Sequence, residues 1–171
     1  MKPENLLFDR DYNLKIADFG FAIVLSGRDG SGMLHTHLGT ESYMAPEIHT
    51  RKPYKGEQVD LFAAGIILFI MMSQNPPFGQ ANPNDPYYKL LYSGQERFWM
   101  LHGRNKPQGF YSDDFKDFMK RICALEPSDR LSMGDLKAHS WYNGPTISKA
   151  DLMGEIGGRR AKIEAQAQAA A

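Results

Sequence analysis

The sequence predicts a mainly helical protein with one small β-hairpin at its N-terminal end. After residue 46, apolar residues recur at the three- and four-residue spacing of helices that bury one face. Residues 1–20 differ, because a short apolar run, a turn cluster and a second short run follow one another there. That order is typical of two strands joined by a tight turn.

The hairpin is expected to have its strands at residues 6–8 and 14–17, with the turn at residues 9–13. Alternation in the second run predicts a half-buried strand. Residues 26–42 follow without periodicity and are rich in Gly, Ser and Thr, which indicates a long functional or mobile loop.

Helix signals mark most of the remaining chain. Asn75-Pro76-Pro77 stops the most apolar helix, and Ser112 and Ser132 are expected N-caps. Beyond Ser148 the composition is helical, is interrupted by Gly157-Gly158, and ends in a low-complexity stretch. We expect helices at residues 46–48, 58–73 and 87–92, and others starting at residues 113 and 133.

Length and charge exclude several classes of function. The chain has 171 residues, with 20 Lys and Arg balanced by 20 Asp and Glu. A zero net charge gives no overall attraction to nucleic acid, so no nucleic-acid partner is expected.

The apolar run at residues 61–72 is too short for a membrane span. No secretory signal is visible, and the lone Cys123 fits a reducing compartment. We expect an intracellular, cytoplasmic location, with the nucleus left open.

The first candidate site lies around Asp18-Phe19-Gly20. A carboxylate directly after a strand, followed by glycine, can present an oxygen ligand to a hard cation such as Mg²⁺. Asn5 is expected on the other strand of the hairpin and could bind the same cation. The alternative, which the turn preferences of Asp and Gly strongly favour for an isolated motif, is that these residues only build a turn.

Three short motifs follow one another along the N-terminal part of the chain at characteristic distances. Lys2-Pro3-Glu4-Asn5 is followed thirteen residues later by Asp18-Phe19-Gly20, and then by a segment from Gly39 to Glu47 that reads Gly-Thr-Glu-Ser-Tyr-Met-Ala-Pro-Glu. Over residues 1–143 the chain resembles the C-terminal lobe of eukaryotic serine/threonine protein kinases. Pro-Pro-Phe at 76–78 and His-Ser-Trp at 139–141 resemble the calcium/calmodulin-dependent or calcium-dependent kinase group.

The resemblance implies ATP and Mg²⁺ as cofactors. Asp18 would bind the Mg²⁺ that bridges the phosphates, and Asn5 would bind the second one. Lys2 would approach the γ-phosphate, or be a plain surface lysine. Leu7 would form the floor under adenine, or be a core residue. Glu4 would belong to the nucleotide-binding residues. Alternatively, it could bind a basic residue of the substrate peptide or have only a structural role.

Further roles come with the same resemblance. Thr40 would line the cleft beside the catalytic base, and Thr36 matches the activation-loop position that relatives phosphorylate, or is unmodified. Phe19 and Gly20 would shape the turn that registers active and inactive states.

The remaining implied roles are structural. Glu47 would form a buried ion pair with Arg130, and Asp60 would hydrogen-bond the backbone of the catalytic loop. Two departures stand out: Phe62-Ala63 replaces the usual Trp-Ser, and Glu41 replaces a proline.

The family pattern His-Arg-Asp-x-Lys-Pro-Glu-Asn places Met1 at x, so the catalytic base would precede Met1. We therefore expect residues 1–143 to be a partial kinase domain without its N-terminal lobe, and residues 144–171 to be a partly helical or disordered tail. The complete kinase would phosphorylate Ser or Thr in protein substrates. The present chain alone should be inactive, because it lacks the catalytic base. Apolar surface near Leu6, Leu7 and Phe19 should be open to the missing lobe or to a partner. The alternative is a non-catalytic, kinase-like binding module.

Overall fold

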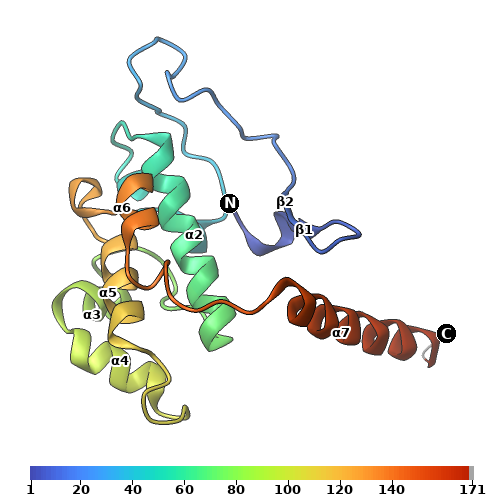
Figure 1. Cartoon of the computed structure of the whole chain (residues 1–171). Helices are drawn as coiled ribbons and strands as arrows, with labels where there is room; N and C mark the ends of the chain where they lie inside the picture. Colours follow the sequence, from blue (N-terminus) through green and yellow to red (C-terminus); the bar gives the residue numbers. More distant parts are fainter. Residues whose placement is uncertain (170–171) are drawn as a thin grey trace. The chain divides into compact units, whose positions relative to one another are not determined.

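The computed structural model describes residues 1–169 and confirms the expected fold class (Figure 1). Within these residues there are seven α-helices and a single two-stranded antiparallel sheet near the N-terminus. The chain divides into two compact units. The helical unit contains Met1–Pro3 and Asp18–Asn143, and the hairpin–tail unit contains Glu4–Ala17 and the tail from Gly144. Each unit is described separately.

Helix α2, Gly56–Ser73, forms the centre of the helical unit. Its buried residues Phe62, Ile66 and Phe69 belong to the main core cluster. Helix α5, Asp113–Ile122, packs alongside it (Figure 1). Gly65 allows this close approach, because a Cβ at this position would lie 2.7 Å from Cγ2 of Ile122.

Local capping explains where the surrounding helices begin. Asp85 caps α3, Pro86–Ser93, by accepting the backbone N–H groups of Tyr87 and Tyr88 at 2.9 Å each. Ser112 accepts the Phe115 N–H at 3.2 Å and caps α5. Ser132 and Asp135 form a reciprocal capping box at the start of α6, Met133–Ala138. The helices expected in these regions, and α1 at Pro46–His49, are confirmed.

Helix α4, Gln95–Gly103, was not predicted from the sequence. Its two buried residues, Phe98 and Trp99, are neighbours in the chain and give no clear helical period. Both rings contact Phe69 of α2, with centroid distances of 5.8 and 6.1 Å. Tertiary packing, rather than a local pattern, therefore stabilises α4.

The hairpin–tail unit contains strands β1, Leu6–Phe8, and β2, Leu14–Ile16, with Leu7 opposite Lys15. The Asp9 carboxylate shapes the turn by accepting the N–H groups of Asp11 and Asn13 at 2.9 Å each. The expected half-burial of the second strand is wrong, because all three residues of β2 are exposed. A two-stranded sheet has too few neighbours to bury one face.

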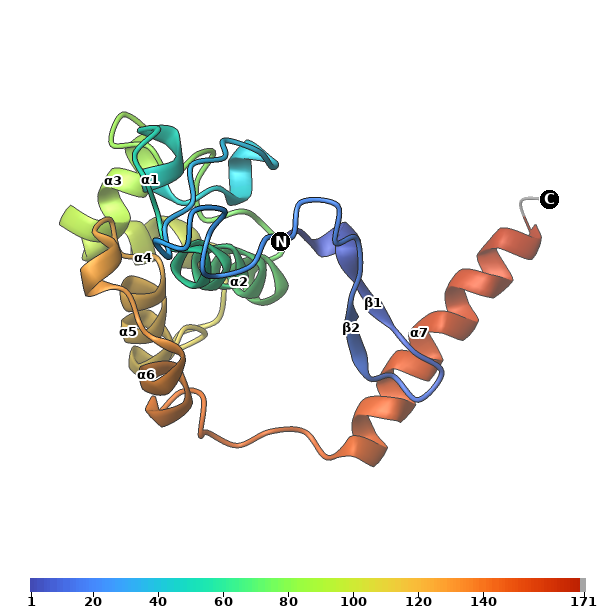
Figure 2. The same cartoon turned by 90° about the horizontal axis from the view of Figure 1, so that it is seen from above.

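Helix α7, Lys149–Ala169, lies beside the hairpin in the same unit (Figure 2). It runs unbroken through Gly157-Gly158, so the expected interruption there is wrong. Ser148 caps the first turn by accepting the Asp151 N–H at 3.1 Å, and ion pairs such as Arg159–Glu155 at 2.8 Å support the later turns. These gains offset a glycine cost of about 1 kcal/mol per residue. The last two residues of the low-complexity end lie outside the described residues.

Helix α2 is also the one helix within residues 1–169 whose length and composition would allow it to cross a membrane. Its 18 residues have a mean hydropathy of 1.5, and the helix is longer than the apolar run at residues 61–72 suggested. Half of this stretch is buried inside the helical unit, as in the core helix of a globular fold. The length argument from residues 61–72 therefore does not hold for this helix, and the absence of a membrane span stays a prediction.

The contact at Gly65 leads to a stability prediction. Gly65→Ala should lower the free energy of unfolding by about 1–3 kcal/mol, because the new methyl group must displace Ile122 and Cys123. Gly103→Ala is the matched control, since nothing lies within 4 Å of a Cβ built there. Urea unfolding followed by tryptophan fluorescence measures both variants. Equal stabilities of the two variants would contradict the packing described for α2 and α5.

Burial of the only cysteine leads to a second prediction. Cys123 is 1% exposed, and burial raises the pKa of its thiol to about 12. At a pH near the ordinary thiol pKa of about 8.5, the folded chain should hold this thiol protonated and unreactive toward a disulfide reagent. Concentrated guanidinium chloride should release one reactive thiol per chain. Rapid labelling of the folded chain would show that Cys123 is accessible.

Candidate active site

A buried ion pair joins α1 to the 3-10 turn Pro127–Asp129 that precedes Arg130. Both guanidinium nitrogens at the fork contact the Glu47 carboxylate, with Nη1 to Oε1 at 2.7 Å and Nη2 to Oε2 at 2.9 Å. The Arg130 side chain is fully buried, and that of Glu47 is 10% exposed. This bidentate geometry is the strong form of a charge-assisted hydrogen bond.

Arg130 also binds two backbone carbonyl groups. Nη1 donates to the Gln58 carbonyl at 3.1 Å, and Nε and Nη2 donate to the Ala124 carbonyl at 3.3 and 3.1 Å. The guanidinium carbon lies 5.0 Å from the centroid of the Phe62 ring. One buried charge therefore has partners on α1, on α2 and after α5, and these compensate for its loss of water.

The Asp18-Phe19-Gly20 turn presents a carboxylate at the surface. Asp18 has a left-handed backbone (φ 60°), and its Oδ1 accepts the Gly20 N–H at 3.2 Å. Phe19 is 69% exposed. An exposed carboxylate on a tight turn suits Mg²⁺, which keeps several waters and uses only one or two protein carboxylates. Within residues 1–169 no group of three or more His, Cys, Asp or Glu side chains is placed to hold a metal ion, and the assignment of Mg²⁺ to Asp18 stays a prediction.

The other expected nucleotide-site residues fall in both units. Lys2, like Asp18, is described with the helical unit and is half-buried. Asn5, Glu4 and Leu7 are described with the hairpin–tail unit. The Asn5 carbonyl accepts the Ala17 N–H at 2.8 Å and closes the open end of the hairpin. Leu7 is 53% exposed, so it is not a core residue within the described part of the chain.

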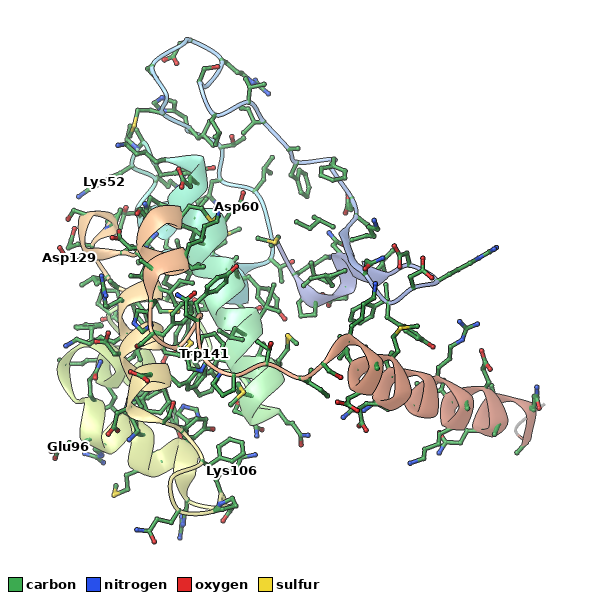
Figure 3. The ribbon with its side chains drawn as sticks, viewed as in Figure 1. Lys52, Asp60, Glu96, Lys106, Asp129 and Trp141 are labelled. Carbon is green, nitrogen blue, oxygen red and sulfur yellow. The ribbon has the colours of Figure 1, made fainter. Side chains whose placement is uncertain are left out.

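Thr36 and Thr40 lie on the long loop before the 3-10 turn Glu41–Tyr43, and both are exposed. The Thr36 carbonyl accepts a hydrogen bond from Tyr54 Oη at 2.6 Å, and the Thr40 carbonyl accepts the Tyr43 N–H at 3.0 Å. Asp60 is exposed, and it lies near the start of α2 (Figure 3).

Some residues that organise this region could not be identified from the sequence. Tyr54 and the carbonyl groups of Gln58 and Ala124 acquire their roles only through the fold. Glu41, noted as a departure from the family pattern, has a partner: Gln80 Nε2 donates to its Oε2 at 2.6 Å. The turn before α1 is thereby joined to the loop after α2.

Residues 1–142 match the family model described as the protein kinase domain. The chain belongs to this family. It is similar to CBL-interacting protein kinase 11 of Oryza sativa subsp. japonica, with 34% identity over 145 residues covering 85% of this chain and 27% of the relative. CBL-interacting protein kinase 28 of the same organism is 33% identical over 165 residues, covering 96% and 35%. CBL-interacting serine/threonine-protein kinase 15 of Arabidopsis thaliana is 35% identical over 144 residues, covering 83% and 31%. The chain thus spans about a third of the length of these relatives.

The ion pair leads to a stability prediction. Glu47→Gln leaves the Arg130 charge buried without its carboxylate, and should lower the free energy of unfolding by about 3–5 kcal/mol. Arg121→Gln is the control, because Arg121 forms a surface pair with Asp117 at 3.9 Å and its loss should cost less than about 1 kcal/mol. Urea unfolding curves measure the difference. Similar losses for both variants would mean that the buried pair does not stabilise the helical unit.

Proposed function

We propose that this chain supplies the C-terminal lobe of a serine/threonine protein kinase, which transfers phosphate from ATP to Ser or Thr hydroxyls of protein substrates with Mg²⁺. The match of residues 1–142 to the protein kinase domain carries the proposal. The relative from Arabidopsis, whose name specifies a serine/threonine kinase, supports the substrate class. On this proposal residues 1–143 are the lobe, and residues 144–171 are an appended tail.

Asp18 and Asn5 are proposed to hold the Mg²⁺ ions, which when bound neutralise the ATP phosphates during transfer. The Gly20 N–H orients the Asp18 carboxylate and leaves that side chain at the surface, which supports the assignment. Lys2 offsets charge that develops on the γ-phosphate. Leu7 contributes an apolar surface beneath adenine, and Glu4 lies at the edge of the nucleotide site.

The loop residues have a supporting role in the same proposal. Thr40 lines the cleft, and Thr36 is the phosphorylation site, where an added phosphate contributes nearly two negative charges. Phe19 and Gly20 form the turn that can adopt alternative positions. Glu47 and Arg130 hold the surrounding backbone, and Asp60, which is exposed near the start of α2, would hydrogen-bond the backbone of the catalytic loop.

The isolated chain is proposed to be inactive. Its 171 residues contain neither His-Arg-Asp nor Gly-x-Gly-x-x-Gly, so a base and a phosphate-binding loop must come from other polypeptide. Leu7 in the hairpin–tail unit and Phe19 in the helical unit are each exposed, and exposed apolar side chains of this size suit contact with an N-terminal lobe or with a partner that replaces it. The same exposure supports a second candidate function, a non-catalytic kinase-like module that docks a partner.

Two finer assignments are also proposals. The calcium/calmodulin-dependent or calcium-dependent kinase group is supported by Pro76-Pro77-Phe78 and by His139-Ser140-Trp141. The latter motif packs on α5, where the Trp141 ring lies 4.9 Å from that of Phe118. An intracellular, cytoplasmic location, with the nucleus left open, is also a proposal, supported by the single cysteine, which fits a reducing compartment.

A fusion tests the catalytic proposal. Residues 1–171 alone should transfer no measurable phosphate from radiolabelled ATP. An N-terminal lobe from an active family member, ending in His-Arg-Asp and joined directly before Met1, should restore Mg²⁺-dependent labelling of Ser or Thr in a protein substrate. Asp18→Asn in the fusion should reduce the rate at least about a hundredfold, because charge stabilisation at the phosphates is lost.

The matched control is Asp11→Asn, which changes an exposed aspartate in the hairpin turn and should leave the rate unchanged. Two results would contradict the proposal. One is a folded fusion without activity, which would favour the docking module. The other is Asp18-dependent activity of residues 1–171 alone, which would overturn the need for a second lobe.

A further inference from the structure

We propose that Tyr54 is a positioning residue for the long loop at residues 26–42. Tyr54 fixes the main chain of residues 34–36 against the start of α2 and thereby places Thr40. The inference deepens the proposed function in one respect, because the catalytic meaning of Thr40 rests on it. The structural part stands on contacts within the helical unit alone.

Three hydrogen bonds join Tyr54 to the loop, and we refer to them as the Tyr54 clamp. The Leu34 N–H donates to the Tyr54 carbonyl at 2.8 Å, and the Tyr54 N–H donates to the Leu34 carbonyl at 2.9 Å. Two residues further on, the Tyr54 hydroxyl donates to the Thr36 carbonyl at 2.6 Å. Backbone and side chain of one residue therefore hold two points of the loop, which restricts both its position and its direction.

Leu34 also anchors the loop by burial. It is 4% exposed, and its Cδ1 lies 3.0 Å from where a Cβ of Gly56 would be. Leu25, at the other end of the glycine-rich segment, approaches the same position to 3.3 Å. Both ends of residues 25–34 thus meet at the first residue of α2, and this segment closes on itself. The exposed residues after Leu34 begin directly at the clamp.

The part of the fold that carries Tyr54 is itself fixed. Tyr54 lies in the connection between α1 and α2. On the α1 side, Glu47 is bound by Arg130, and on the α2 side Arg130 binds the Gln58 carbonyl. Because the same buried guanidinium holds both ends of the connection, Tyr54 is attached to a rigid base. The clamp holds the main chain at Thr36, and Thr40 follows four residues later in the same loop.

The clamp uses the Thr36 carbonyl and leaves the Thr36 side chain at the surface. A phosphate on the hydroxyl is therefore compatible with an intact clamp. The same geometry separates two roles at one position, because Thr36→Ala removes the hydroxyl and keeps the carbonyl. Tyr54→Phe does the reverse, since it deletes only the donor to that carbonyl.

Hydrogen exchange on the full chain tests the clamp without any need for activity. Tyr54→Phe should speed exchange of the Leu34 amide about five- to tenfold, because one net hydrogen bond is lost locally. The Tyr43 amide, whose acceptor is the Thr40 carbonyl, should also exchange faster. Thr36→Ala and Tyr142→Phe, the latter at an exposed tyrosine, should leave both rates within about twofold. Unchanged exchange of either amide in Tyr54→Phe would overturn the inference.

The active fusion adds a kinetic readout that a merely structural role would not change. Tyr54→Phe should raise the KM for the protein substrate several-fold while the KM for ATP and the urea midpoint remain constant. An equal change in both KM values would overturn the positioning role. A fusion that is inactive even with Tyr54 counts against the proposed function instead, and the exchange rates then decide the clamp by themselves.

Discussion

The ion pair between Glu47 and Arg130 is the interaction on which the arrangement of the helical unit depends. It joins residues 83 positions apart in the sequence, and the guanidinium is completely removed from water. Such a charge is tolerated only when its donors are satisfied, and here a carboxylate and two carbonyl groups supply the acceptors. Helix α1 has four residues, too few to be stable alone. Its position therefore follows from the ion pair and from its buried neighbours.

The local features of the fold could be predicted because each has a nearby cause. The Asp9 turn, the serine caps at 112 and 132, and the stop after α2 all arise from side chains acting on backbone a few residues away. The stop is sharp because Gln74 adopts a left-handed conformation (φ 63°) immediately before Asn75 and two prolines. The sequence could not reveal α4, because its burial depends on contacts with Phe69 of α2. Helix α7 continues through two glycines because a cap and several ion pairs each add a small stabilisation, and their sum could not be read from the sequence.

The candidate site was less accessible from the residues alone. Asp18 and Asn5 suggested a cation only as one of two open interpretations, and the roles came from agreement of several motifs with a known family. The pairing of Glu47 with Arg130 had no local signal, since nothing in either segment refers to the other. Tyr54 was missed for the same reason, because its hydroxyl meets a carbonyl 18 residues earlier in the chain. Long-range hydrogen bonds of this kind are specified by the fold as a whole.

The exposed and buried parts of the helical unit have different tasks. Asp18, Thr36 and Thr40 lie on exposed loops, whereas the groups that orient the surrounding backbone are buried or half-buried. Replacing a buried ion pair by apolar side chains is often neutral for stability, so stability alone does not explain why charge is used here. A planar guanidinium, however, donates hydrogen bonds to carboxylate and carbonyl oxygens only along fixed directions. The pair therefore favours one orientation of the α1–α2 connection, to which the loop is attached through Tyr54, whereas an apolar contact of equal strength has no such preferred direction.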